Sequence, residues 1–163
     1  MKFRIVVTGL LAATMCACST TQIKATRIKS GIIYAPAIRI ADPDSPTGHM
    51  QSSKSVDGII ETTYIPAELG KRFGTIFVLI GPQQGLMLDY QVVWRFPEPG
   101  LTNPKTQITQ HIYRHTNQCK VGALCGATWS LTEPFEVVPG EWELELRIKD
   151  APFFTQTFEV YTK

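Results

Sequence analysis

Four side chains that could ligate a metal lie close together in the chain: His111, His115, Cys119 and Cys125. Two imidazoles and two thiolates form a ligand set that tetrahedral zinc accepts. On a β-strand, however, the two histidines point to the same face, which we expect to be the solvent face. They would lie about 13 Å apart, because each residue advances about 3.3 Å. One ion could bind both only if the segment were helical, and residues 112–114 favour helix weakly. The spacing therefore argues against a metal site.

The two cysteines have a simpler use. Cys119 and Cys125 enclose a short segment that contains Gly122. In an exported protein, an oxidising compartment favours a disulfide between them. Closing so short a loop stabilises a fold by about 2 kcal/mol. We expect this disulfide and no bound metal, with two unpaired thiols as the remaining alternative.

Other patterns that could support catalysis are weak. The chain has three histidines and no serine in a Gly-x-Ser-x-Gly turn. Glu143 and Glu145 face the same way about 7 Å apart, as paired carboxylates do, but they alternate with an apolar row, which indicates a solvated strand face. Glycine-rich phosphate loops and Cys-x-x-Cys pairs are missing. We expect no catalytic residue and no cofactor. A metal-dependent or hydrolytic periplasmic enzyme that uses His111 and His115 is the alternative.

The first residues predict a location. Lys2 and Arg4 precede an apolar run over residues 5–15, and Ala17 precedes Cys18. This order is typical of a secretory signal, and the run is too short to span a membrane. It resembles a bacterial lipoprotein signal, which implies that residues 1–17 are removed and that Cys18 carries fatty acyl chains such as palmitate. The resemblance implies an anchor in the outer membrane, with the domain on its periplasmic face. Cleavage near Ala17 to give a soluble periplasmic protein is the alternative.

The charge balance narrows the possible partners. Loss of Lys2 and Arg4 with the leader would leave fourteen basic and fourteen acidic residues. A net charge of zero argues against nucleic acid, whose binding depends on clustered Lys and Arg. We expect an envelope protein or a cell-wall component as the partner, with the membrane reached through the lipid.

Apolar residues recur mostly with period two, which predicts β-strands. The clearest strand covers residues 142–148, where apolar and charged side chains alternate. Strands at 86–96 and 154–160 repeat the pattern. Weaker strand candidates are residues 22–35, 37–41, 59–64, 75–80, 108–115 and 127–131. Trp94, Trp129 and Trp142 are expected in the core.

The pattern predicts an all-β fold, since no segment carries a helical stripe of ten or more residues. Strands at this spacing favour an immunoglobulin-like two-layer β-sandwich, with a small barrel as the alternative. We expect a tether and first strand over residues 18–35 and a single sandwich domain over 36–163. Within that domain, residues 42–56 are rich in Ser, Thr and Pro and predict a mobile loop.

Proline and glycine residues recur in three motifs along the second half of the chain. The motifs are Ile65-Pro66 with Gly70, Phe73 and Gly74; Pro99 to Pro104; and Pro134-Phe135 followed by Val138 to Trp142. Together they resemble a bacterial family of secreted domains known only as a domain of unknown function, over about residues 58–160. The cysteine insert and residues 20–56 depart from it. The resemblance implies the sandwich and a bacterial envelope source, and it implies no catalytic residue.

One of these motifs is a candidate contact surface. Loops on a rigid sandwich often carry binding residues, and edge strands can accept a partner strand. The candidate contact loop consists of Pro99, Gly100, Leu101, Thr102, Asn103 and Pro104.

Overall fold

The computed structural model describes residues 23–36, 38–52 and 58–162, in which every element but one is a β-strand. The elements are β1 (Lys24–Tyr34), β2 (Ile38–Ala41), β3 (His49–Ser52), β4 (Gly58–Glu61), β5 (Tyr64–Pro66), β6 (Arg72–Ile80), β7 (Met87–Arg95), β8 (Leu101–Asn103), β9 (Ile108–Gln110), β10 (Ile112–Lys120), β11 (Leu124–Ser130), the 3₁₀ turn η1 (Pro134–Glu136), β12 (Gly140–Ile148) and β13 (Ala151–Tyr161). No helix within these ranges is long and apolar enough to cross a membrane. The prediction of an all-β chain is confirmed.

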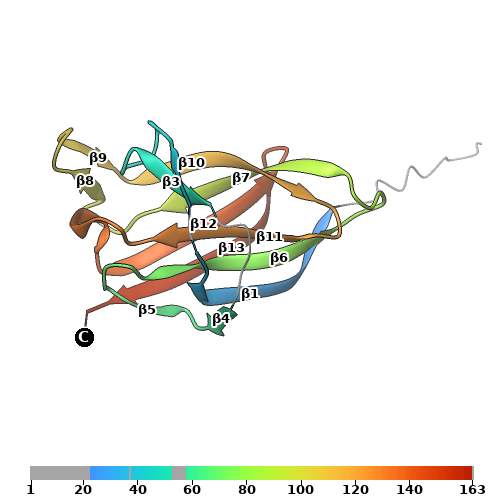
Figure 1. Cartoon of the computed structure of the whole chain (residues 1–163), viewed down its shortest axis with the longest axis horizontal. Helices are drawn as coiled ribbons and strands as arrows, with labels where there is room; N and C mark the ends of the chain where they lie inside the picture. The colour runs from blue at the N-terminus through green and yellow to red at the C-terminus, as the bar shows by residue number, and fades with distance from the viewer. Residues whose placement is uncertain (1–22, 37, 53–57, 163) are drawn as a thin grey trace, which may run out of the picture.

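Two large sheets form the layers of a sandwich (Figure 1). One has the order β11-β6-β1-β4 and the other β10-β7-β12-β13-β5. Neighbouring strands are antiparallel except β13 and β5, which run parallel. The hairpins β2-β3 and β8-β9 form two small additional sheets and project on the same side of the sandwich as β10 (Figure 1).

Aromatic side chains fill the space between the sheets. Phe73 of β6 contacts Trp94, Trp142 and Phe158 of the opposite sheet edge-to-face, with ring centroids 5.7, 5.6 and 5.2 Å apart. Such aromatic pairs add to the stability gained from burial alone. Trp129 is also buried. The three tryptophans therefore lie in the core, as their positions in the apolar rows predict.

The opposite face of β12 is charged and partly exposed to solvent. Arg95 of β7 lies 2.5 Å from Glu143 and 3.0 Å from Glu145, and Arg147 lies 2.5 Å from Glu145. Both carboxylates are therefore paired with guanidinium groups across the sheet. Their position on the face of β12 that points away from the core agrees with the predicted alternation.

Two predicted strands are each divided between sheets. Residues 59–64 were expected to form one strand, but β4 belongs to the first sheet and β5 to the second. Residues 108–115 divide into β9, which pairs only with β8, and β10, which pairs with β7 as far as Lys120. The apolar pattern continues through both breaks although β4 and β9 are largely exposed, with Ile60 and Ile108 among the exposed apolar residues.

The prediction of a loop at residues 42–56 is wrong for residues 49–52. These residues form β3, which pairs with β2 in register, Ile40 opposite Met50. Side chains tie the intervening turn: the Ser45 and Thr47 hydroxyls each donate to the backbone oxygen of His49 at 2.8 Å. These Ser and Thr side chains therefore form hydrogen bonds with backbone groups of a hairpin, as short polar side chains do in turns. Residues 53–57 lie outside the described residues.

Candidate functional site

A groove runs between β10 and β11, each of which is the last strand of its sheet. A short loop joins the two strands, and a disulfide links Cys119 to Cys125 with Cα atoms 5.9 Å apart, an ordinary disulfide separation. The predicted disulfide is thus confirmed. The groove has a volume of about 490 Å³, within the range of small-molecule sites.

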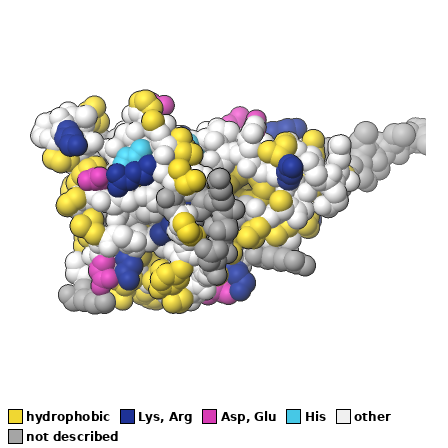
Figure 2. Space-filling view, in the orientation of Figure 1, with side chains coloured by type: hydrophobic (Ala, Val, Ile, Leu, Met, Phe, Trp, Pro, Cys, Tyr) yellow, Lys and Arg dark blue, Asp and Glu magenta, His cyan; other side chains and the backbone are white. Residues whose placement is uncertain are grey.

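The groove wall combines apolar and basic side chains. Met50, Met87 and Leu124 are its long apolar residues, and Asn117 and Gln118 are polar. Arg72 and Lys120 are its cations, and no Asp or Glu occurs among the described lining residues. Figure 2 shows basic and acidic side chains interspersed over one face of the molecule.

Arg72 is the unusual member of this wall. Strand alternation turns Phe73 into the core, so Arg72 points to the outer face of β6, where its Nε and Nη2 donate to Thr128 Oγ1 at 3.1 and 2.8 Å. The residue is only 6% exposed, and Nη1 has no hydrogen-bond partner. Burial lowers the pKa of Arg72, and no described carboxylate forms an ion pair with it. A buried cation without a counter-charge is costly.

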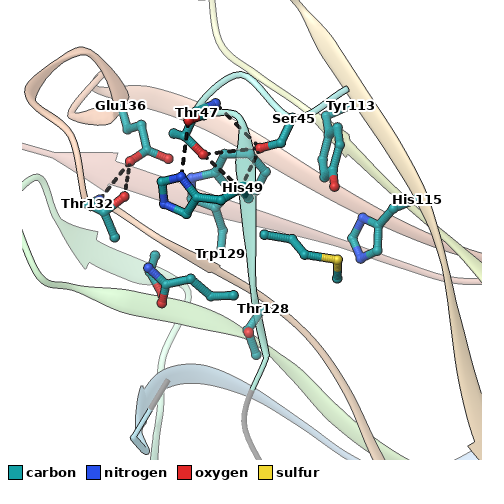
Figure 3. A pocket seen from close by; sticks show the side chains of 12 residues that line it. Ser45, Thr47, His49, Tyr113, His115, Thr128, Trp129, Thr132 and Glu136 are labelled. Atoms are coloured by element: carbon teal, nitrogen blue, oxygen red, sulfur yellow. Dashed lines mark hydrogen bonds between the residues drawn. The ribbon is translucent and has the colours of Figure 1, made fainter. Parts of the chain in front are cut away.

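A second, smaller cavity adjoins the groove and shares Met50, Gln51, His115 and Thr128 with it (Figure 3). Ser45, His49 and Glu136 are among its lining residues. Its volume of about 30 Å³ matches one or two water molecules and is too small for an organic ligand. The groove is therefore the only one of these two cavities that could hold a substrate-sized molecule.

Glu136 is a buried carboxylate that lines the smaller cavity. It is 1% exposed, and its Oε2 accepts hydrogen bonds from the Thr132 backbone N–H at 2.7 Å, the Thr132 hydroxyl at 2.8 Å and the Glu133 N–H at 2.7 Å (Figure 3). Burial raises the pKa of Glu136, while these hydrogen bonds act in the opposite direction. The carboxylate thus satisfies the backbone at the start of η1, which is a structural role.

Ser45 and His49 do not form a nucleophile and base. The Ser45 hydroxyl donates to the His49 backbone oxygen, and His49 Nδ1 lies 3.1 Å from the Thr47 carbonyl oxygen. Activation of a serine needs a hydrogen bond from its hydroxyl to the imidazole ring. Both side chains instead hold the β2-β3 turn.

His115 lies on the inner side of β10, against the prediction that it faces solvent. It pairs with buried Val92 of β7 and stacks on Tyr113, with ring centroids 5.0 Å apart. Burial lowers the pKa of His115 to about 4, although the charge of Asp42 acts in the opposite direction. The Tyr113 hydroxyl in turn donates to the Asp42 carboxylate. His115 is therefore a neutral imidazole at the wall that separates the two cavities.

Comparison with protein families identifies the fold's relatives. The model of a domain of unknown function, DUF3859, matches residues 21–160. The chain belongs to the DUF3859 family. A comparison with curated proteins finds no match.

Solved structures support the immunoglobulin-like architecture of this DUF3859 domain. An immunoglobulin-like protein from Pseudomonas aeruginosa is 23% identical, and the alignment covers 88% of this chain and 99% of that one with a TM-score of 0.63. A β-D-glucoside glucohydrolase from Trichoderma reesei is 13% identical over 87% of this chain and 19% of that one, and its TM-score of 0.38 is too low to support an inference. The predicted immunoglobulin-like sandwich is thus confirmed.

The candidate contact loop of the DUF3859 domain is only partly a surface. Leu101 is fully buried and Gly100, with φ +88°, is buried beside it, whereas Pro99, Thr102 and Pro104 are exposed. Residues 101–103 form β8, and Asn103 donates to the Pro46 carbonyl oxygen at 2.8 Å. The segment therefore anchors the β2-β3 turn as well as offering exposed side chains.

The other sequence-based site predictions have different outcomes. Cys18, the predicted lipidation site, lies outside the described residues. His111 precedes β10 and lies 3.5 Å from Glu98, away from His115. Within the described ranges no three His, Cys, Asp or Glu side chains are grouped to hold a metal.

Sequence reasoning missed Arg72 and Glu136. Arg72 begins a strand whose following residues, from Phe73 to Phe77, are all buried, so a charged residue at its head could have been suspected. Glu136 follows Pro134-Phe135 and has no periodic signal of its own.

Proposed function

We propose that this DUF3859 domain is a non-catalytic binding domain of the bacterial envelope. In this proposal, lipid on Cys18 anchors it to the periplasmic face of the outer membrane, and the groove between β10 and β11 binds an envelope protein or a cell-wall component. The observation that carries the proposal is the groove itself, which has ligand size and contains the buried, incompletely bonded Arg72.

Binding is favoured over catalysis by the use of the nearby reactive side chains. Ser45, His49 and Glu136 are each engaged with backbone groups of their own turns. His115 is neutral and stacked on Tyr113. These contacts give each of these side chains a structural role, although one ring nitrogen of His49 and one of His115 have no partner. Arg72 differs because it is a buried cation with an unpartnered donor.

The tether rests on the leader pattern around Ala17 and Cys18. Cys18→Ala should move the protein from the membrane fraction to the soluble fraction, and Cys16→Ala is the matched control that should leave it anchored. More than one acyl chain makes such attachment durable. Membrane association of Cys18→Ala, or a mass for the wild type without lipid, would contradict the tether.

Site-specific photocrosslinking in intact envelopes tests the groove. Leu124 lines the groove and is 56% exposed, so a photoreactive residue there should capture the partner. Tyr64 on β5, at the far edge of its own sheet and 65% exposed, is the matched control. An adduct formed from position 124 alone is expected. Adducts formed equally from both positions, or only from position 64, would place the binding surface elsewhere.

A further inference from the structure

We propose that the ligand of the groove is an anion with an apolar part, whose charged oxygen binds the guanidinium of Arg72. The inference rests on the proposed function, because it names the chemistry of the ligand for the same groove. It follows from three properties of the groove: its charge, its hydrogen-bonding capacity and its apolar wall.

The charge of the groove is unbalanced. Arg72 and Lys120 are the cations among its described lining residues, and no described carboxylate lines it. Several other described cations lie beside a carboxylate: Lys29 lies 2.6 Å from Glu61, and Arg95 and Arg147 lie 3.0 and 2.5 Å from Glu145. An anionic group entering the groove would supply the counter-charge that Arg72 lacks.

The unused hydrogen-bond donor of Arg72 also indicates that an anion binds there. Thr128 Oγ1 accepts from Nε and Nη2 of Arg72 and fixes the guanidinium plane, which leaves Nη1 without a partner. A guanidinium matches the oxygens of carboxylate and phosphate. Nη1 is shielded from solvent, so the ligand must shift a neighbouring side chain to reach it. His115 lines the same groove, and its Nδ1 is also buried and without a hydrogen-bond partner.

The apolar residues of the groove wall indicate that the ligand also has an apolar part. Met50, Met87 and Leu124 line the groove, and Met87 and Leu124 are 47% and 56% exposed. Methionine side chains adapt to varied ligand shapes. A fully hydrated small anion would leave this apolar surface uncovered. An amphiphilic anion would cover the surface and neutralise Arg72 at the same time.

Methyl NMR can test the ligand class directly. The chain has four methionines, and the two that follow Cys18 are Met50 and Met87, both in the groove. The full chain, labelled with ¹³C-methyl methionine, would be titrated with decanoate, decyl phosphate and the neutral decanol, with resonances assigned through Met50→Leu and Met87→Leu. Decanoate or decyl phosphate should shift both methyl resonances and should bind at least about tenfold more tightly than decanol, as expected for a charged hydrogen bond. The stronger of the two anions identifies carboxylate or phosphate as the group recognised.

The variant Arg72→Met should weaken anion binding by about tenfold or more and leave decanol binding unchanged. Arg39→Gln, at an exposed arginine of β2 outside the groove, is the matched control and should bind like the wild type. Unchanged methyl dispersion in the Arg72→Met spectrum would show that the variant is folded. If that variant fails to fold, Thr128→Val, which frees the guanidinium from its fixed plane, should also weaken the anions selectively.

The possible failures are distinguishable. Equal binding of decanol and decanoate, or equal anion binding by wild type and Arg72→Met, would overturn the anion inference while leaving the groove as a binding site. Methyl resonances that respond to none of the three probes would overturn the inference, and the photocrosslinking at Leu124 would then decide the proposed function separately.

Discussion

Arg95 and Arg72 show opposite treatments of the same side chain within one sandwich. Arg95 lies on the solvent face of its sheet, 40% of its side chain is exposed, and it contacts both Glu143 and Glu145. Arg72 lies on the outer face of the other sheet, is 6% exposed and has no described carboxylate partner. The arginine with access to water is neutralised by two acids, and the buried one is not.

The pKa directions reflect this difference. For Arg95, partial desolvation lowers the pKa, but the hydrogen bonds and charges of Glu145 and Glu143 outweigh it and the pKa is raised. For Arg72, desolvation is the one influence that the described residues supply, and the pKa is lowered. Paired surface charges contribute little to stability, and unpaired buried charges oppose it. The Arg95 network is therefore nearly neutral for folding, whereas the unpaired charge of Arg72 is unfavourable in the protein without a ligand.

The comparison of Arg95 with Arg72 depends on which face of each strand points into the core. Substitutions on β12 test this assignment and have the largest expected effect. Trp142→Ala should cost about 3 to 5 kcal/mol of unfolding free energy, because the side chain is fully buried against Phe73. Glu143→Ala, one residue along, should be nearly neutral because Glu143 lies in the exposed pair. Urea denaturation of both variants measures the difference. A larger loss for Glu143→Ala would reverse the assigned faces.

Burial of His115 in the groove wall should make the stability of the protein depend on pH. The folded pKa of His115 is about 4, below its ordinary value of 6.5, so its contribution is fully present above pH 6.5 and is lost as the pH falls towards 4. The expected loss is about 3 kcal/mol. Denaturation midpoints between pH 7 and pH 4 for wild type and His115→Gln measure it.

His111→Gln is the control for this pH series, since the His111 side chain is 55% exposed beside Glu98. It should retain the wild-type slope, whereas His115→Gln should flatten it. A His115→Gln profile as steep as that of the wild type would mean that burial does not lower the pKa of His115, and the imidazole would then become charged near its ordinary pKa of 6.5.

The disulfide that closes the end of the groove gives a smaller expected effect. Replacing Cys119 and Cys125 together with Ser should lower stability by about 1 to 3 kcal/mol and leave the sandwich folded, because the bridge restrains only a short loop. Thiol labelling before and after reduction checks the bridge, and elemental analysis checks for metal. Free thiols with one bound ion per chain would contradict the disulfide.

Much of the fold was accessible from the sequence because period-two rows reflect burial on one strand face. Residues 142–148 could be assigned by face as well as by type, and Trp142 and Leu144 are buried as that pattern requires. The exchange of sheets between β4 and β5 was not accessible, since periodicity records burial but not the identity of the neighbouring strand.

The site was less accessible for a related reason. Cys119 and Cys125 are close in the sequence, so their pairing could be predicted from the sequence. The groove needs β10, β11 and residue 72 together, and no local pattern states that these distant segments meet. His115 was assigned to the wrong face because its strand neighbours on β7, including Val92, decide its burial.

The smallest expected effect tests the two arginines directly. If Arg72 were needed for folding, its removal should cost about 3 to 5 kcal/mol, as the breaking of a buried ion pair does. Because Arg72 has no described carboxylate, we expect Arg72→Met to change the unfolding free energy by less than about 1 kcal/mol: relief of the buried charge offsets the lost hydrogen bonds to Thr128. Arg95→Met should lose up to about 1 kcal/mol, the value of an exposed pair. Urea denaturation of the two variants at pH 7 compares them under one condition. A loss of several kcal/mol for Arg72→Met would make that residue a structural element of the sheet and remove the contrast on which the ligand class depends.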